Sequence, residues 1–259
     1  MKADPGQDAA IHGSHWDAVH GGYFSDVTVA APLLEKVEEA VERTRAEVVV
    51  DLGGGTGFLL AQLAARGKCA GRRLINLDSS DEQLAAVRGR GIERVHASID
   101  RFSRAELAPG NPRIVWIMRS ALHYSGKQGL LPELQHLRRQ AQSGEPFVHQ
   151  TACFERAREA ECLNMLYRGM HTDKWYPTVS HLGRLLAKAG WRVDGMAAAP
   201  ALPLTAHDLS ARYGLSAPAI VSIFTALERK FGAMAGVLDL SPGRFCAYLH
   251  YRIAVCMAD

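Results

Sequence analysis

The chain has 259 residues, of which 47% are hydrophobic and 22% charged, and its formal net charge is +3. This length suits one large α/β domain or a domain with a small cap, and so small a charge gives no argument for a nucleic-acid or acidic-membrane partner. Five cysteines without a C-x-x-C pair argue against a disulfide framework and a zinc ribbon. The N-terminus is polar and no apolar run reaches the ~18 residues of a membrane span, so a soluble, cytoplasmic protein is expected.

The N-terminal region, residues 1–45, is expected to be a helical segment that precedes the core. His12 and His15 are spaced i and i+3 and invite a metal-site hypothesis. Glycines nearby argue against a rigid helical site and no carboxylate cluster completes it, so no metal is predicted. An amphipathic helix is predicted over 32–45 from Leu33, Leu34, Val37 and Val41.

The next segment has the pattern of a buried strand, a glycine turn and a helix. Val48, Val49 and Val50 lead into Asp51, which ends the strand. Glycines without Cβ atoms let such a turn adopt positive φ and approach a ligand closely. Leucines at helical spacing follow the turn, and the predicted helix ends near Gly67. The glycines of the turn are Gly53, Gly54, Gly55 and Gly57.

The spacing of these glycines argues against two phosphate-binding turns. The dinucleotide fingerprint needs a third glycine where the chain has Phe58, and a phosphate loop needs G-K-[ST] where the chain continues after Gly57 with Phe58 and Leu59. Asp51 would repel a pyrophosphate but suits a cationic ligand, such as one with an amino group and a sulfonium. A turn without any ligand is the alternative, and the backbone entropy of four glycines argues against it.

The pattern acid-x-G-x-G-x-G over 51–57 resembles the first motif of class I S-adenosylmethionine-dependent methyltransferases of the small-molecule type. The resemblance covers the turn closely and residues 46–151 more loosely. It implies a Rossmann-like, doubly wound, mostly parallel sheet of seven strands, the last antiparallel, within a core over 46–203. It also implies S-adenosylmethionine as cofactor, S-adenosylhomocysteine as product, and an N-terminal lid over the cofactor for which Trp16 and Tyr23 are suited. Plain N-terminal packing is the alternative for these two residues.

A second strand is predicted over 72–78 and ends in Asp78. A carboxylate at this tip can accept hydrogen bonds from both ribose hydroxyls of an adenosine. Asp78 and its neighbour Ser79 are therefore assigned to the cofactor. Asp78 could instead start the next helix, which is less favoured because Ser79 and Ser80 already serve as caps.

A third strand over 93–98 leads into Ile99 and Asp100. The resemblance implies that the acid contacts the adenine amino group and that the apolar residue packs on the ring. The alternative for Asp100 is to cap a helix beginning at Arg101.

A fourth strand over 114–118 precedes Arg119, His123 and Tyr124. Ligands of open α/β sheets bind beyond the carboxyl ends of the strands, so these residues fall near the chemistry. A histidine that titrates near neutrality can remove the proton of an attacking O–H or N–H group. The stretch resembles R-x-x-L-H-[HYF] of small-molecule methyltransferases. His123 is thus the candidate base and a substrate contact, with packing as its alternative, while Arg119 is assigned to the cofactor and Tyr124 to the substrate.

The fifth strand, over 146–151, places His149 in the core and Gln150 at the tip, where it could reach a substrate. Cys153 has no cationic or histidine partner evident from sequence and is not predicted to be a nucleophile. Helices are predicted over 154–168 and 178–189. The loop between them carries Trp175 and Tyr176, which suit a substrate wall, with structural packing as the equal alternative.

A sixth strand is predicted from Trp191, and the final strand of the core, within 237–259, over 245–253. Between them, residues 204–236 form a predicted helical insert with the rhythm of a helix-turn-helix. DNA binding is disfavoured because residues 216–222 offer almost no side chain that reads base edges. A cover for the active site or an oligomer contact, such as a homodimer, is expected instead.

The function that this sequence predicts is methyl transfer from S-adenosylmethionine to an O or N nucleophile of a small-molecule metabolite, with no nucleic-acid or membrane partner. Two alternatives stay open. One transfers the aminocarboxypropyl arm of the same cofactor to a small amine. The other is a regulator that binds the cofactor without catalysis.

Overall fold

The computed structural model describes residues 22–240 and 245–259. Its centre is one sheet with the strand order β3-β2-β1-β4-β5-β8-β6, and a short β7 pairs with β8 beside this path. The first five strands pair in parallel, and β8 is antiparallel to β5 and β6. The predicted mostly parallel sheet with an antiparallel last strand is confirmed. The strands are β1 (Val48–Leu52), β2 (Arg73–Asp78), β3 (Ile92–His96), β4 (Ile114–Arg119), β5 (Pro146–Ala152), β6 (Trp191–Thr205), β7 (Leu238–Asp239) and β8 (Cys246–Ala258).

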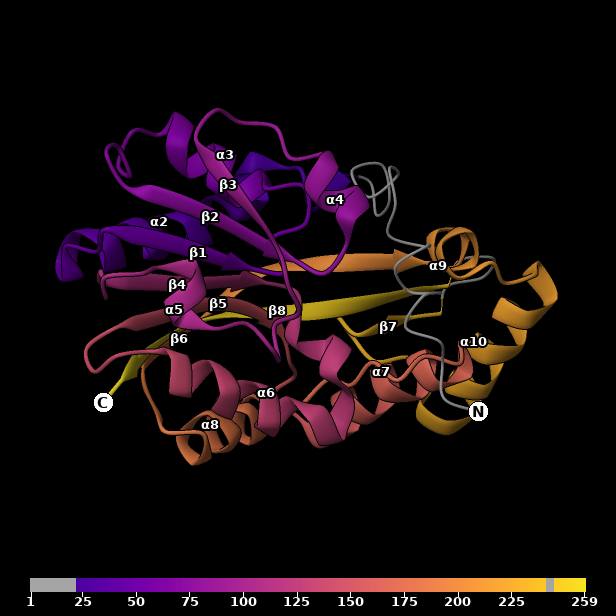
Figure 1. Cartoon of the computed structure of the whole chain (residues 1–259). Coiled ribbons are helices and arrows are strands. Elements are labelled where there is room, and N and C mark those ends of the chain that lie inside the picture. The colour runs from indigo at the N-terminus through magenta and orange to yellow at the C-terminus, as the bar shows by residue number, and fades with distance from the viewer. Residues whose placement is uncertain (1–21, 241–244) are drawn as a thin grey trace.

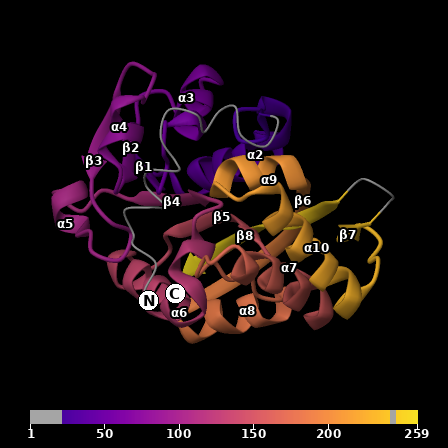
Figure 2. The ribbon, with the colours of Figure 1, turned by 90° about the vertical axis from the view of Figure 1, so that its right-hand side faces the viewer.

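Helices cover both faces of the sheet (Figures 1 and 2). The faces are defined by alternation along each buried strand: Val49 packs with α2 and α3, whereas Val48 and Val50 point to α5, α6 and α8. Helix α4 connects β2 to β3. These helices are α2 (Val27–Thr44), α3 (Phe58–Ala65), α4 (Asp81–Ala85), α5 (Arg104–Leu107), α6 (Gly126–Gln140) and α8 (Val179–Lys188).

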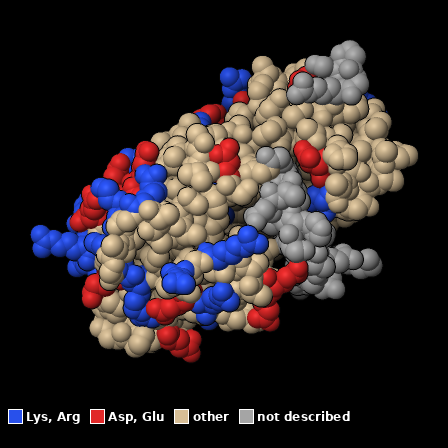
Figure 3. All heavy atoms as spheres, turned by 90° about the horizontal axis from the view of Figure 1, so that it is seen from above, with Lys and Arg blue, Asp and Glu red and all other residues tan. Residues whose placement is uncertain are grey.

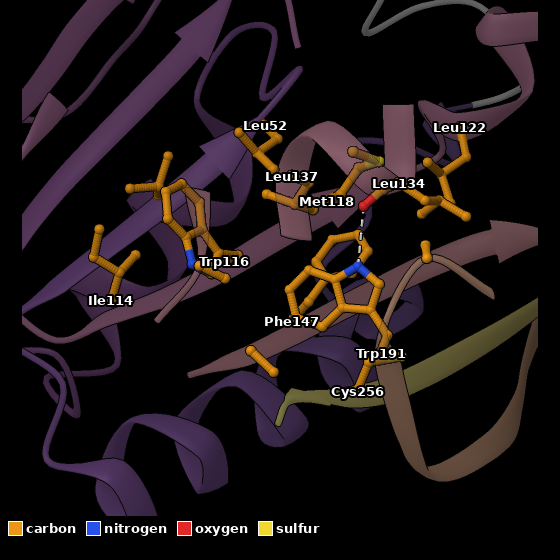
Figure 4. Close-up of a cluster of buried hydrophobic side chains, with 14 of the residues drawn as sticks. Leu52, Ile114, Trp116, Met118, Leu122, Leu134, Leu137, Phe147, Trp191 and Cys256 are labelled. Carbon is orange, nitrogen blue, oxygen red and sulfur yellow. Dashed lines mark hydrogen bonds between the residues drawn. The ribbon is translucent and has the colours of Figure 1, made fainter. Parts of the chain in front are cut away.

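A tightly packed cluster on one face fixes α6 to the sheet (Figure 4). Trp191, at the start of β6, lies against Phe147 of β5 with ring centroids 5.4 Å apart. Its indole N–H donates to the backbone oxygen of Leu134 at 3.1 Å, as the dashed line in Figure 4 shows. The buried tryptophan therefore contributes apolar area without leaving a polar group unsatisfied.

A further hydrophobic cluster joins α7 (Ala157–Gly169), α9 (Ala206–Tyr213) and α10 (Ala217–Phe231) to the long strands β6 and β8. Tyr23 and Phe24, just before α2, belong to the same cluster. The helices α9 and α10 pack together at one end of the molecule, at the right of Figure 1. This end therefore brings the segment before α2 together with the late helices.

The surface of the described residues carries no feature that points to a charged partner, a membrane or a metal. On the face shown in Figure 3, positive and negative side chains intermingle and form no patch of one sign. No helix within residues 22–240 and 245–259 is long and apolar enough to cross a membrane. Among the same residues, no three His, Cys, Asp or Glu side chains gather as a metal site would require. The predictions made for His12, His15 and Trp16 lie outside the described residues.

Most predicted elements match within a few residues, and three boundaries differ. Helix α2 begins at Val27, earlier than predicted, because Asp26 accepts hydrogen bonds from the backbone amides of Thr28 and Val29. Helix α5 begins at Arg104, so the alternative of a helix capped by Asp100 is wrong. The final strand runs on to Ala258, past the predicted end at residue 253, because its partners β5 and β6 continue on both sides.

Candidate functional site

The site lies where the carboxyl ends of β1, β2, β4 and β5 meet. Strand register sets Asp51 beside Asn76 on one side and Ile117 on the other, and pairs Arg119 with Gln150. Parallel strands bring their carboxyl ends to the same edge of a sheet, which is where α/β proteins bind ligands.

The glycine turn after β1 uses its backbone amides to hold its own shape. Gly53, Gly55 and Gly57 have φ values of 66°, 55° and 73°, which favour glycine. The amides of Gly53 and Gly54 donate to the Leu77 oxygen at 2.8 and 3.2 Å, and the amide of Gly57 donates to the Gly54 oxygen at 3.0 Å. A phosphate-binding turn would aim such amides at its ligand. The amides of Gly53, Gly54 and Gly57 already donate within the protein and so are not available to bind a phosphate.

Beneath the turn lies a buried, unsatisfied carboxylate. Asp51 is 1% exposed, and within the described chain neither of its oxygens has a hydrogen-bond partner. The side-chain oxygen of Asn76 is also buried without a partner among these residues. Burial and, to a lesser extent, the charge of Asp78 raise the pKa of Asp51 to about 7, against the opposing effect of Arg119. Buried acceptors of this kind are costly unless a donor meets them, so this corner is suited to a ligand with N–H groups.

The backbone of Gly54 lies so close to Asn76 and Asp51 that only a residue without a side chain fits there. A Cβ atom there would lie 2.0 Å from Oδ1 of Asn76 and 2.7 Å from Oδ2 of Asp51. Asn76 cannot easily turn away, since its Nδ2 donates to the Gly55 oxygen at 2.8 Å.

We expect Gly54→Ala to lower the free energy of unfolding by roughly 1–3 kcal/mol, the usual cost of overpacking. The matched control is Gly183→Ala in α8, where a Cβ meets nothing within 4 Å. That change should stabilise the protein by about 0.5–1 kcal/mol, because alanine favours helix. Urea denaturation of both variants measures the difference, and equal stability of the two would show that the corner is open.

Asp78 braces the glycine turn. Its Oδ1 accepts from the Ser80 amide and its Oδ2 from the Gly55 amide, both at 2.9 Å. The cap of α4 is Ser80, whose hydroxyl accepts from the Gln83 amide. Asp78 therefore does not start this helix, and each of its oxygens keeps a lone pair for a further donor. The neighbouring Ser79 is exposed, and its carbonyl oxygen is bonded to the His96 ring.

Ile99 and Asp100 follow β3 beside the turn. The Cδ1 atom of Ile99 lies 3.2 Å from the position that a Cβ on Gly53 would occupy, so Ile99 packs on the turn. Asp100 is exposed and accepts from the Ser98 hydroxyl. Ile99 therefore places an apolar group next to the glycines, and the acid Asp100 follows it in the chain.

Arg119, at the tip of β4, is enclosed by aromatic rings. Its guanidinium lies 5.6 Å from the ring centre of Tyr23, 5.4 Å from that of Phe24 and 5.9 Å from that of Phe58. It donates to the backbone oxygens of Phe24 at 2.9 Å and Tyr23 at 3.3 Å. Burial lowers the pKa of Arg119, and the nearby Asp51 opposes that change. The segment before α2 is thus tied to the tip of β4.

Tyr23 and Gln150 lie together at this tip. The Tyr23 hydroxyl donates to the Pro200 oxygen at 2.5 Å, and its ring stacks on Tyr251 with centroids 5.8 Å apart. Gln150 is fully buried, and its side-chain amide donates to the Tyr23 hydroxyl at 3.3 Å. Gln150 therefore positions Tyr23 in this arrangement.

A pocket with an empty volume of about 230 Å³, which includes space open to solvent, adjoins this cluster. Ser120 lines the pocket, and its hydroxyl bonds at 2.8 Å to that of Tyr251, the residue that stacks on Tyr23. The backbone of Ser120 has a positive φ of 58°. Two cations, Lys174 and Arg212, also line the pocket. Its aromatic walls are Phe24, His123, Tyr124, Tyr167, Tyr176 and Tyr251.

His123 is held between two tyrosine rings in this pocket. It is 6% exposed, with ring centroids 4.3 Å from Tyr124 and 5.3 Å from Tyr176. Its backbone oxygen accepts from the Trp175 amide at 3.2 Å. The predicted substrate residues His123, Tyr124 and Tyr176 are therefore brought together at one wall.

Trp175 lies elsewhere, with its ring against His181 and against the hydrophobic cluster under α6 and α8. Sequence reasoning also left out Tyr167, Arg212 and Tyr251. They lie on α7, α9 and β8, and their approach depends on tertiary packing. Lys174 could have been predicted as a pocket residue, since it directly precedes Trp175 and Tyr176 in the loop that was expected to form a substrate wall.

Comparison with known proteins gives a match only at the level of structure. No family model matches the sequence, and no curated protein is similar to it. A putative methyltransferase from Bacillus halodurans aligns over 87% of this chain and 98% of its own, with a TM-score of 0.68 and 13% identity. The YcgJ protein of Bacillus subtilis aligns over 88% and 98%, with a TM-score of 0.62 and 13% identity.

Human N-acetylserotonin methyltransferase, solved with S-adenosylmethionine, aligns over 93% of this chain and 57% of its own, with a TM-score of 0.52 and 14% identity. Together with the strand order, these likenesses show that the chain has the class I methyltransferase fold.

Proposed function

We propose that the chain binds S-adenosylmethionine at the glycine turn and transfers its methyl group to an oxygen or nitrogen of a small molecule. The observation that carries the proposal is the buried Asp51, whose unpartnered oxygens lie under a glycine that admits no side chain. A ligand without a hydrogen-bond donor would leave this carboxylate unsatisfied, and an anionic ligand would repel it. A ligand with a protonated amino group satisfies it.

The residues present fit the parts of this cofactor. Asp51 would accept from the amino group, and Asp78 keeps lone pairs for the ribose hydroxyls. Arg119 is half-buried at the tip of β4, and its Nε has no partner among the described residues, which suits a carboxylate. Ile99 and Asp100 supply the apolar and polar contacts for an adenine. The structural neighbours include one solved with S-adenosylmethionine, which supports the same assignment.

When bound, this cofactor supplies a methyl group on a sulfonium, and the carbon–sulfur bond that breaks leaves its electron pair on sulfur. The chain's own task is to align the acceptor and to keep water out. The aromatic walls of the pocket provide both. The His123 ring, buried at one wall, would take the proton that leaves the acceptor's O–H or N–H group.

We expect Asp78→Ala to weaken S-adenosylmethionine binding at least tenfold, because each charged hydrogen bond contributes about 1.5–3 kcal/mol. Calorimetric titration measures the affinity, and Asp81→Ala, an exposed acid three residues on, is the control. Unfolding curves show whether loss of the bonds to Gly55 and Ser80 has loosened the turn. Unchanged affinity in a folded Asp78→Ala variant would reject the ribose role.

The proposal as a whole is tested by incubating the protein with S-adenosylmethionine and candidate acceptors and weighing the products. A product heavier by one methyl group supports it. A gain of an aminocarboxypropyl group would assign the other transfer from the same cofactor. Tight binding without turnover on any acceptor pool would indicate a regulator.

A further inference from the structure

The loop between α7 and α8 contacts His123 at two points. The Trp175 amide donates to the His123 backbone oxygen at 3.2 Å. The next residue, Tyr176, stacks its ring on the imidazole, with centroids 5.3 Å apart and an angle of 26° between the planes. Tyr176 is itself 1% exposed. The position of this loop therefore bears on the orientation of the His123 ring.

A side chain of α7, Asn164, holds Tyr176 by its backbone. The Nδ2 atom of Asn164 donates to the Tyr176 oxygen at 2.9 Å, and its Oδ1 accepts from the Tyr176 amide at 2.8 Å. Asn164 thus exchanges two hydrogen bonds with one residue, as a residue of a paired strand does. It is only 7% exposed, so loss of its side chain would leave buried backbone groups without these partners.

The helix itself gives no reason for an asparagine at this position. Asparagine is a weak helix former, because its side chain competes for backbone hydrogen bonds. Helix α7 runs over Ala157–Gly169, so Asn164 lies in its interior and not at an end that it could cap. Leu163 and Leu166, on either side, are buried and apolar. The contact with Tyr176 therefore accounts for a polar residue among them.

A second residue of α7 holds the ring of Tyr176. Tyr167 lies three residues after Asn164 and so on the same face of the helix. Its ring packs against that of Tyr176 with centroids 4.9 Å apart, and the two side chains are hydrogen-bonded to each other. One face of α7 thus fixes both the backbone and the ring of Tyr176. The ring that meets His123 cannot turn without losing these contacts.

We propose that Asn164 is a positioning residue for proton transfer at His123: it fixes the backbone of Tyr176, whose ring orients the imidazole. This rests on the proposed function, in which the proton of the acceptor's O–H or N–H group passes to that imidazole. A base acts only within hydrogen-bond reach of the proton it removes, and a displacement of about 1 Å can lower a rate about 10²-fold. Asn164 acts through Tyr176 and touches neither cofactor nor acceptor in this role.

The test observes the His123 ring by nuclear magnetic resonance of the whole protein with isotope-labelled histidine. The signals of His123 are those that His123→Asn removes. A stacked aromatic ring shields the protons of its neighbour. We therefore expect Asn164→Leu, which has a similar size and no polar atoms, to move the ring-proton signals of His123 downfield. Tyr176→Leu, which removes the stacked ring itself, should move them in the same direction.

Two further measurements connect this signal with the reaction. In Asn164→Leu, S-adenosylhomocysteine affinity from calorimetry should be unchanged, because the glycine turn is not altered. With the acceptor that product mass identifies, kcat should fall about 10–100-fold at an unchanged KM for S-adenosylmethionine. The control is Cys162→Ala. Cys162 is also buried in α7 but lies two residues before Asn164, on a different side of the helix, so the His123 signals and kcat should stay as they are.

A folded Asn164→Leu variant with wild-type His123 signals would overturn the inference, since Asn164 would then serve stability alone. Shifted signals with an unchanged kcat would equally overturn its role in proton transfer. If Asn164→Leu does not fold, Asn164→Asp decides, because a carboxylate accepts from the Tyr176 amide but cannot donate to the Tyr176 oxygen. A smaller downfield shift in this variant supports the inference, and no shift overturns it.

Failure of the proposed function is recognised separately, in variants that keep Asn164. Wild-type protein that does not bind S-adenosylmethionine would overturn the proposed function. A His123→Asn variant that keeps its turnover would overturn the role of His123 as a base. Either result removes the reaction that Asn164 is proposed to serve, whatever the His123 signals show. Wild-type binding, loss of turnover in His123→Asn and unmoved signals in Asn164→Leu would overturn the inference alone.

Discussion

Replacing Asp51 with asparagine is expected to stabilise the free protein at pH 8 and to remove most of its affinity for S-adenosylmethionine. Burial raises the pKa of this carboxyl from 3.8 to about 7. The folded state therefore holds the proton more tightly than the unfolded state. The stabilising contribution of this raised pKa is fully present below about pH 4 and is lost as pH rises through about 7. The free energy of unfolding changes by up to about 4 kcal/mol between these limits.

At pH 8 the asparagine avoids this buried charge, so Tm should rise by about 5 °C or more, while at pH 5 the gain should be small. Cofactor affinity should fall at least tenfold, because a neutral amide replaces a charged acceptor. Thermal unfolding at both pH values, with and without S-adenosylmethionine, gives the two effects together. Asp81→Asn, an exposed acid, should show neither. A variant that is destabilised at pH 8 would mean that Asp51 is satisfied within the fold.

Replacing His123 with asparagine is expected to lower kcat by about 10²–10⁴, the usual contribution of a general base. Asparagine preserves much of the shape between Tyr124 and Tyr176, so S-adenosylmethionine affinity should change little. In the wild-type protein, kcat/KM should fall toward acid pH as a base becomes protonated, and the variant should lack this decline. Steady-state kinetics over about pH 6 to 8 measures both.

His207→Asn, on the exposed side of α9, is the matched control for this substitution and should keep wild-type kinetics. If His123→Asn also kept most of its kcat across this range, the imidazole would serve packing alone. Catalysis would then consist of alignment. That result would leave the roles of Asp51 and Asp78 unaffected, because they concern the cofactor.

The proposed cofactor half of the site could largely be predicted from the sequence because its signals are local. A run of β-branched residues, an acid and a glycine turn occupy 48–57, and the structure puts them at the end of a buried strand. Asp78 could be placed beside them because consecutive strands of a strand-helix-strand unit lie next to each other. What the pattern did not show is that Asp78 also holds the Gly55 amide.

The proposed acceptor half was harder to predict because it is assembled from segments far apart in the chain. Tyr23 reaches Pro200, and Ser120 reaches Tyr251, contacts that no local periodicity predicts. The segment that contains Arg212 has the apolar spacing of a helix-turn-helix. That spacing predicts two helices but does not show that Arg212 lines the pocket. Trp175 illustrates the opposite difficulty, since an aromatic residue next to a pocket residue can face the core.

The position of β8 has a consequence for how the chain folds as it is made. This strand lies between β5 and β6, which do not pair with each other, so it joins the last two parts of the sheet. It also follows the other described strands in chain order, since β5 ends at Ala152 and β8 begins only at Cys246. Until then β5 presents an open edge, which is a site for pairing with other nascent chains. Shortening β8 should therefore reduce the soluble yield in cells more than its loss of buried area suggests.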